Sequence, residues 1–295
     1  MEFLESKLKE VRVTTDVEAT TDVSLETPNP CIVITEESCE LESCMETLRQ
    51  VKELALDCEG VDLGRAGQIC IVQLSTREQC YLLDVHGISK SSKLALFLKE
   101  ILESLDIVKI IHDCSMDADA LCHHLNIRIR NIHDTQCWDK QIHHTTTSTN
   151  LNNTLVSYNL LPNSVRNCSI YDTQPTFWAT RPMTPSMIDW ASGDVKSLFL
   201  LYDKQCELAS PDEAAAAQKA STHNARLLPS LMMTPFQVHP DNMGRLIGKG
   251  GCNIRALKEK HPRAFIVSKR NGVVWIYAEN NIEQHLITKR LARYR

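Results

Sequence analysis

The sequence lacks several features that would assign a protein class at once. No stretch reaches about 18 consecutive apolar residues, and the opening MEFLESKLKEV has no apolar core of the kind found in signal peptides. Twelve cysteines are present, but no two of them form a C-x-x-C pair. We therefore expect no membrane association and mostly buried, reduced thiols, which are typical of a cytoplasmic protein or, as a second choice, a nuclear one.

Two further absences concern internal repeats and zinc sites. The sequence shows no internal repeat. The histidine clusters Cys122-His123-His124 and His143-His144 have no second ligand pair at zinc spacing, so we do not expect zinc there.

Charge is distributed unevenly along the chain. Residues 236–295 hold 12 Lys and Arg against 4 Asp and Glu, whereas the remaining residues hold 20 bases and 33 acids. A basic module on an acidic body predicts that the module contacts a polyanion.

The hydrophobic pattern divides the chain into four regions. Residues 1–28 are polar, Thr-rich and acidic, which is typical of a disordered arm. Residues 29–208 show three closely spaced strands and then alternating helices and strands, which predicts an α/β domain with a mixed sheet of about five strands flanked by helices. Residues 209–235 are Ala-rich without a strong apolar stripe and predict a helical, flexible connector. Residues 236–295 predict a small α+β domain.

Two acids interrupt an apolar strand in LALDCEG. Asp57 and Glu59 are two positions apart, so they project from the same face of the strand. Burying unpaired carboxylates costs several kcal/mol, so the pair needs a partner. Hard divalent cations such as Mg²⁺ or Mn²⁺ prefer carboxylate oxygens, and two such ions can hydrolyse a phosphodiester.

Two ions need more than two acids. The stretch IIHDCSMDADAL follows a strand and supplies Asp113, Asp117 and Asp119. The helical stretch IDWASGDVKSL supplies Asp189 and Asp194.

These motifs resemble the DEDD 3′–5′ exonucleases of the RNase D type. LALDCEG, HDCSMDADAL, HDTQ and W-x-x-RPMT with ASGDVKSL follow the family order between about residues 30 and 206, and the D-C-E-G motif is similar to the Egalitarian-like branch. The resemblance implies an RNase H-like fold, two Mg²⁺ or Mn²⁺ ions, and release of nucleoside 5′-monophosphates from a 3′ end. It also implies the catalytic and metal-binding residues, which are Asp57, Glu59, Asp117 and Asp194. Asp113 and Asp119 fit less well, because the family places its second acid five residues after a histidine, here His112.

One position departs from the family pattern. Many relatives place a tyrosine or a histidine four residues before the last acid, where it orients or deprotonates the attacking water, but this chain has Trp190. An indole N–H donates a hydrogen bond and cannot accept a proton. The four acids favour an active metal-dependent exonuclease. The alternative is a catalytically weak or inactive RNA-binding adaptor that uses the exonuclease fold for partner contacts. A metal-binding scaffold unrelated to nucleic acid is a third and weaker reading.

Two more residues near the motifs have expected roles. Asp134, in HDTQ, is expected to cap a helix or make local hydrogen bonds. Arg181 is expected either to contact a substrate phosphate or to form a surface ion pair.

The run LIGKGGCNIRALKEK predicts a glycine-rich loop at a helix junction, where the backbone can approach a phosphate chain. It is not a Walker loop, because its spacing is one residue short and no Ser or Thr follows the lysine. It resembles the G-x-x-G loop of a KH domain, which clamps about four nucleotides of single-stranded nucleic acid. The resemblance implies single-stranded RNA as the partner in preference to DNA, and it leaves room for protein partners in an RNA-processing complex. The implied RNA-binding residues are Gly248, Lys249, Gly250, Gly251 and Arg255.

Overall fold

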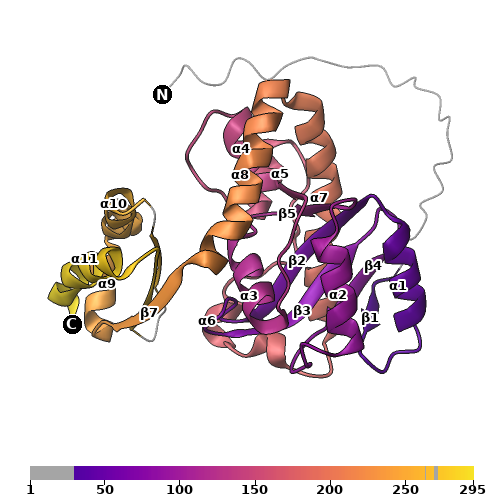
Figure 1. Cartoon of the computed structure of the whole chain (residues 1–295), viewed down its shortest axis with the longest axis horizontal. Coiled ribbons are helices and arrows are strands. Elements are labelled where there is room, and N and C mark those ends of the chain that lie inside the picture. Colours follow the sequence, from indigo (N-terminus) through magenta and orange to yellow (C-terminus); the bar gives the residue numbers. More distant parts are fainter. Residues whose placement is uncertain (1–29, 263, 269–271) are drawn as a thin grey trace, which may run out of the picture.

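The computed structural model describes residues 30–262, 264–268 and 272–295. Two domains follow one another along the chain, and the larger first domain is built on a six-stranded sheet in the order β1-β4-β3-β2-β5-β6 (Figure 1). The predicted disordered arm at residues 1–28 lies outside the described residues. The strands of the first domain are β1 (Ile32–Ile34), β2 (Glu53–Val61), β3 (Gln68–Ser75), β4 (Cys80–Asp84), β5 (Val108–Ile111) and β6 (Ile132–Asp134).

The sheet is mixed, as the strand pattern predicts. β2, β3 and β4 form an antiparallel meander, while β1 pairs in parallel with β4, and β5 pairs in parallel with both β2 and β6. The predicted number of about five strands is one too low. The three-residue strand β6 is short, and only its parallel pairing with β5 makes it part of the sheet.

Helices cover both faces of this sheet. One layer contains α1 (Leu41–Gln50), α2 (Lys93–Glu103) and α3 (Ser115–Leu125), and the other contains α5 (Leu151–Ser157) and α7 (Pro185–Leu208). Along β2, Leu54, Leu56 and Cys58 join the first layer, whereas Ala55 joins the layer of α7. Because side chains alternate along a strand, residues in phase with Ala55 also face α7.

The segment predicted to be a helical, flexible connector contains a packed helix. α8 (Pro211–Ser230) lies against α3, α4 (Thr135–Ile142) and β6, and its buried face contains Ala217, Ser221, Ala225 and Leu228. Three of these four side chains are small, so they form no apolar stripe in the sequence, yet they let neighbouring elements approach closely. The helix is therefore part of the first domain and not a free tether.

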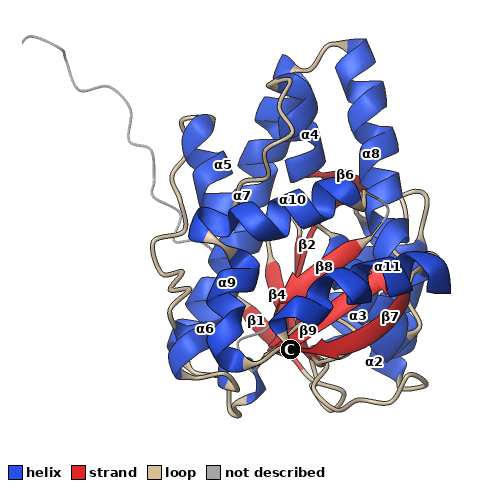
Figure 2. Cartoon of the chain, turned by 90° about the vertical axis from the view of Figure 1, so that its left-hand side faces the viewer, coloured by secondary structure: helices blue, strands red, loops and turns tan. Residues whose placement is uncertain are grey.

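The second domain is a three-stranded antiparallel sheet in the order β7-β9-β8, with helices on one face (Figure 2). Its element order is the predicted one, but β7 begins at Met232, four residues before the predicted boundary. Pro235 is tolerated inside β7 because this is an edge strand. The elements are β7 (Met232–Gln237), α9 (Met243–Ile247), α10 (Cys252–Lys260), β8 (Phe265–Ser268), β9 (Val273–Ala278) and α11 (Asn281–Leu291).

The twelve cysteines are free thiols, and six of them are buried. None of the helices that the structure describes is long and apolar enough to cross a bilayer.

Candidate active site

Strand β2 positions the first two acids of the candidate site. Asp57 and Glu59 are in phase with Ala55 and face α7, and a β-bulge follows between Glu59 and Gly60. A Cβ at Gly60 would lie 2.0 Å from the carbonyl oxygen of Gln68, so no side chain fits there. The glycine of the D-C-E-G motif is therefore required by close packing of the backbone at the bulge.

Helix α7 positions the last acid. It begins at Pro185, and the hydroxyl of Thr184 caps it by accepting a hydrogen bond from the Met187 N–H at 3.3 Å. The buried residues Val195 and Leu198 pack against the sheet, as their spacing predicts. This anchoring holds the buried Asp194 opposite β2.

Three of the four predicted acids converge. One oxygen each of Asp57, Glu59 and Asp194 lies within 4.8 Å of the others, and no second cluster of three potential metal ligands occurs in the described parts of the chain. Asp117 lies outside this cluster but lines the same cavity, which has a volume of about 510 Å³. Its Oδ1 accepts a hydrogen bond from the Cys58 N–H at 3.1 Å, which places it next to β2.

The neighbouring acids differ in their surroundings. Asp113 also lines the cavity. Asp119 is buried in an ion pair with Arg65, whose Nε lies 2.8 Å from Oδ1. Asp134 caps α4 by accepting a hydrogen bond from the Gln136 N–H at 3.1 Å, as expected. These contacts give Asp119 and Asp134 structural roles.

Arg181 forms an ion pair and does not line the cavity. Its Nη2 lies 2.7 Å from Oδ1 of Asp84, and its Nη1 donates to the carbonyl oxygen of Trp178 at 2.9 Å. Of the two expected roles, the structure shows the ion pair.

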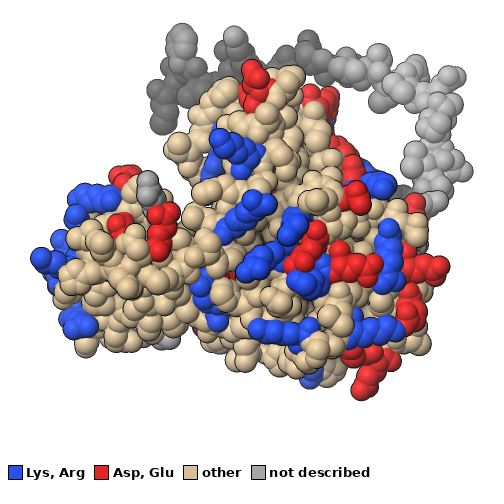
Figure 3. All heavy atoms as spheres, in the orientation of Figure 1, with Lys and Arg blue, Asp and Glu red and all other residues tan. Residues whose placement is uncertain are grey.

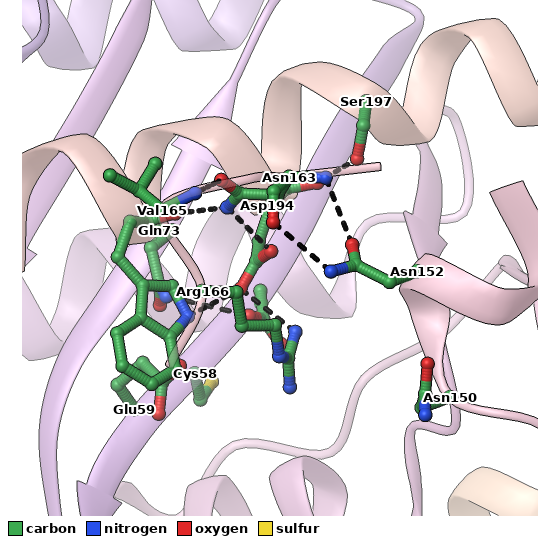
Figure 4. A network of polar contacts seen from close by, with 12 residues as sticks. Cys58, Glu59, Gln73, Asn150, Asn152, Asn163, Val165, Arg166, Asp194 and Ser197 are labelled. Atoms are coloured by element: carbon green, nitrogen blue, oxygen red, sulfur yellow. Dashed lines mark hydrogen bonds and ion pairs between the residues drawn. The ribbon is translucent and has the colours of Figure 1, made fainter. Parts of the chain in front are cut away.

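Three donors surround the carboxylate of Asp194 (Figure 4). Asn163 Nδ2 donates to Oδ1 at 2.9 Å, while Arg166 Nη1 and Trp190 Nε1 both reach Oδ2, at 2.9 and 3.0 Å. The indole of Trp190 therefore lies beside Asp194, where relatives carry a phenol or an imidazole. Its only N–H is already engaged with the carboxylate.

Sequence reasoning missed two side chains that complete this site. Arg166 pairs with Asp194, and the hydroxyl of Tyr171 donates to Oε2 of Glu59 at 3.2 Å. Both lie in the stretch between α5 and α7, where no periodic pattern indicates a role. A basic and an aromatic residue in an otherwise polar loop are too common to be noticed without the fold.

Burial raises the pKa values of the clustered carboxyls. Desolvation, with the charge of Asp194 adding to it, raises the pKa of Asp57 to about 7. Burial and then the charge of Asp57 raise the pKa values of Glu59 and Asp117 well above the usual range. Arg166 counteracts part of this effect on Asp57 and Glu59. The repulsion among the negative charges of the cluster is therefore larger than the attraction of one guanidinium can offset.

The donor set fits a hard divalent cation. Asp57, Glu59 and Asp194 offer only carboxylate oxygens, which suit Mg²⁺ or Mn²⁺, and no thiolate or imidazole joins them. Among the described residues, Arg166 is the cation that pairs with Asp194, and such an ion would have to compete with it.

We expect Arg166→Gln to bind Mn²⁺ about tenfold more tightly than the wild type, because the variant removes the competing positive charge from the cluster. Calorimetric titration of each protein with Mn²⁺ measures this. Lys196→Gln is the matched control, since it removes a cation from an exposed position on α7. Equal or weaker binding by the Arg166 variant would show that the guanidinium does not compete with the ion.

The predicted RNA-binding loop lies in the second domain, between α9 and α10. Gly248, Gly250 and Gly251 all have positive φ angles, of 74°, 57° and 80°, which other residues rarely adopt. Lys249 is exposed, and Arg255 folds back to donate to the carbonyl oxygen of Gly250 at 2.5 Å. The loop therefore presents backbone and positive charge to solvent.

Comparisons with known proteins agree with both domains. A family model described as 3′–5′ exonuclease matches residues 32–206, and one described as KH domain matches residues 234–283. The exosome complex exonuclease RRP6 of Saccharomyces cerevisiae is 30% identical over 168 residues, which cover 57% of this chain and 21% of that protein. The piRNA biogenesis protein EXD1 of Mus musculus is 28% identical over 160 residues, which cover 50% of this chain and 28% of that protein. The chain thus spans less than a third of the length of either relative.

Solved structures share the fold of the first domain. RNase D of Trypanosoma brucei has a TM-score of 0.58 at 19% identity, covering 67% of this chain and 72% of that one. Brucella melitensis NrnC with bound Mg²⁺ has a TM-score of 0.54 at 18% identity, covering 66% of this chain and 90% of that one. The described architecture is thus the RNase H-like fold of the RNase D type. With a family match over more than half of its length, the chain belongs to the 3′–5′ exonuclease family, and it carries a KH domain after the exonuclease domain.

Proposed function

We propose that this protein is a metal-dependent 3′–5′ exonuclease that hydrolyses single-stranded RNA and holds its substrate with the KH domain. The observation that carries the proposal is the convergence of Asp57, Glu59 and Asp194 within 4.8 Å, in a cavity that Asp117 also lines. The RNA preference is supported by the intact G-x-x-G loop and by a similar structure, Trypanosoma brucei RNase D, which was solved in complex with RNA.

The chain's own residues supply binding and orientation. The four acids would hold two ions, Mg²⁺ or Mn²⁺, which when bound lower the pKa of a water and stabilise charge on the phosphate oxygens. Tyr171 fixes one oxygen of Glu59, and Trp190 fixes one oxygen of Asp194. The indole of Trp190 has no proton-accepting atom, so its position offers no general base.

A second function is favoured by one specific contact. Arg166 already neutralises Asp194, as a resident cation would in a site that no longer needs a metal ion. Together with Trp190, this ion pair supports the alternative of an RNA-binding adaptor with weak or no hydrolysis.

One experiment separates the two functions. The full chain is incubated with a 5′-labelled single-stranded RNA and Mn²⁺, and the products are resolved by length. A ladder that shortens from the 3′ end, and that disappears when Mn²⁺ is chelated, supports the nuclease. Full-length RNA that stays bound but uncut supports the adaptor.

The KH loop gives a second test. Lys249→Asp combined with Gly250→Asp should lower RNA affinity about tenfold or more, because it places negative charge against the phosphate backbone. Gly250 has open space around it, and aspartate tolerates positive φ, so the domain should stay folded.

Binding is measured by fluorescence anisotropy with the full chain. Lys289→Asp with Arg290→Gln is the control, since it makes the same change in net charge on α11, outside the loop itself. An equal loss of affinity in both proteins would show that the loop makes no specific contribution to RNA binding.

A further inference from the structure

The KH sheet is docked on the exonuclease domain. Its inner face packs on its own helices, whereas Trp275, Tyr277 and Phe265 on the outer face join Leu228 and Leu231 in a separate apolar cluster. We call this cluster the seam. Figures 1 and 2 show the KH domain next to the exonuclease domain, with α10 crossing in front of it in the second view.

A half-buried arginine reinforces the seam. Arg65 of the exonuclease domain pairs with Asp119, donates to the carbonyl oxygen of Leu231 at 2.8 Å, and lies over the ring of Tyr277, 5.2 Å from its centroid. The guanidinium thus contacts α3, the end of the α8 segment and the KH sheet together. Such a contact fixes the orientation of one domain relative to the other.

The seam reaches the acid cavity. Met116, on the first turn of α3, packs against the seam and also lines the cavity, one residue before Asp117. Because Met116 contacts both the seam and the cavity, the KH sheet lies next to the cavity wall.

Lys258 lies at this junction. It is on α10, the helix that follows the GxxG loop, and its Nζ is 5.2 Å from the ring centroid of Phe265 in the seam. Burial lowers the pKa of its ammonium, and the carboxylate of Asp113, a cavity residue, partly offsets that effect. No ion pair holds Lys258 within the described residues.

A second lysine lies beside the acid cavity. Lys140, on α4, interacts with Asp113 and donates to Oε1 of Gln136, which lines the cavity. In Figure 3, Lys and Arg side chains of the exonuclease domain lie near the line where the two domains meet, whereas those of the KH domain lie on its outer edge in this view. Phosphate groups of a strand that leaves the KH loop would meet cations along the way to the acids.

We propose that the KH domain and the acid cavity form one continuous path for a single strand, in which Lys258 binds a phosphate between the GxxG loop and the cavity. The inference rests on the proposed function and specifies its substrate as RNA with a single-stranded 3′ segment long enough to occupy both sites. The docked geometry means that KH binding presents the 3′ end to the acids directly. Strands too short to span the path would be hydrolysed without help from the KH domain.

The test compares Lys258→Glu with Lys260→Glu in the full chain. Lys260 is on the same helix, but it lines a different cavity, with α11 residues such as Lys289. Two substrates are used: a single-stranded RNA of about 20 nucleotides, and a dinucleotide, which is shorter than the roughly four nucleotides that a KH loop clamps. Binding of the longer RNA without divalent ions and hydrolysis of both RNAs with Mn²⁺ are measured.

We expect Lys258→Glu to weaken binding and kcat/KM for the longer RNA about tenfold, with dinucleotide hydrolysis unchanged and a smaller effect of Lys260→Glu. Lys258→Gln, which removes the charge without reversing it, should give an intermediate loss. Equal effects of the Lys258 and Lys260 changes, or an equal loss on both substrates, would overturn the path. If the wild type cuts neither RNA while the difference in binding remains, the nuclease proposal fails and the path stands.

Discussion

Asp57→Asn combined with Glu59→Gln should lower the rate of RNA hydrolysis about 10³-fold or more, because two charged metal ligands become neutral amides. The amides keep the size of the carboxyls, so the strand and its bulge should remain intact. Release of labelled 3′-terminal nucleotide in Mn²⁺ measures the rate. Asp189→Asn is the control, since this acid lies on α7 at an exposed position outside the cavity.

The same double variant should be more stable than the wild type when no divalent ion is present. A carboxyl whose pKa is raised on folding stabilises the protein below its unfolded pKa, and this contribution is lost as pH rises through the folded pKa. For Asp57 that folded pKa is about 7. The wild type should therefore melt at a lower temperature at pH 8 than at pH 5, and the variant should show a smaller difference. Mn²⁺ should raise the melting temperature of the wild type alone.

A variant that loses activity without gaining stability at pH 8 would contradict this account. It would mean that the acids are not strained against one another in the free protein. A variant that keeps its activity would show that the cluster is not required for hydrolysis.

Trp190→Tyr should accelerate RNA hydrolysis about 10²-fold, because a phenol can accept and donate hydrogen bonds to water and assist proton transfer. Trp190 is 2% exposed and packs edge-on against Trp178, so the smaller ring leaves a cavity and should cost about 1–3 kcal/mol of stability. The gain in rate should appear despite that loss. Initial rates across a pH series in Mn²⁺ measure it.

Trp190→Phe is the matched control. It creates a similar cavity but has no hydroxyl, so its rate should not exceed that of the wild type. Equal rates of the Tyr and Phe variants would show that the hydroxyl at this position does not limit the reaction. Such a result would favour Tyr171, already bonded to Glu59, as the phenol that matters in this chain.

Part of the site follows from the sequence because it depends on local periodicity. Strand alternation puts Asp57 and Glu59 on one face, and helical spacing puts Trp190 beside Asp194, as the structure shows. The strand and helix order of the KH domain likewise follows from local pattern and turn residues. Arg166 could not be found in this way, because it reaches Asp194 from a loop that only the tertiary fold brings over β2.

The connector shows a second limit of sequence reasoning. Hydrophobic periodicity detects large apolar residues, but α8 packs through Ala217, Ser221 and Ala225. Because these side chains are small, neighbouring elements can lie close to the helix. Polar contacts add to this, since Asn224 Nδ2 donates to Asp134 at 2.7 Å. Neither feature stands out in an Ala-rich, polar segment, so the sequence alone does not indicate that this helix is packed.

The seam has a consequence for how the two domains can be separated. A fragment that ends with α8 would uncover Met116 and Leu228, which the aromatic face of the KH sheet now shields from water. Contiguous apolar surface of this kind promotes self-association. Removal of the KH domain would therefore expose apolar surface of the exonuclease domain that the KH sheet now covers.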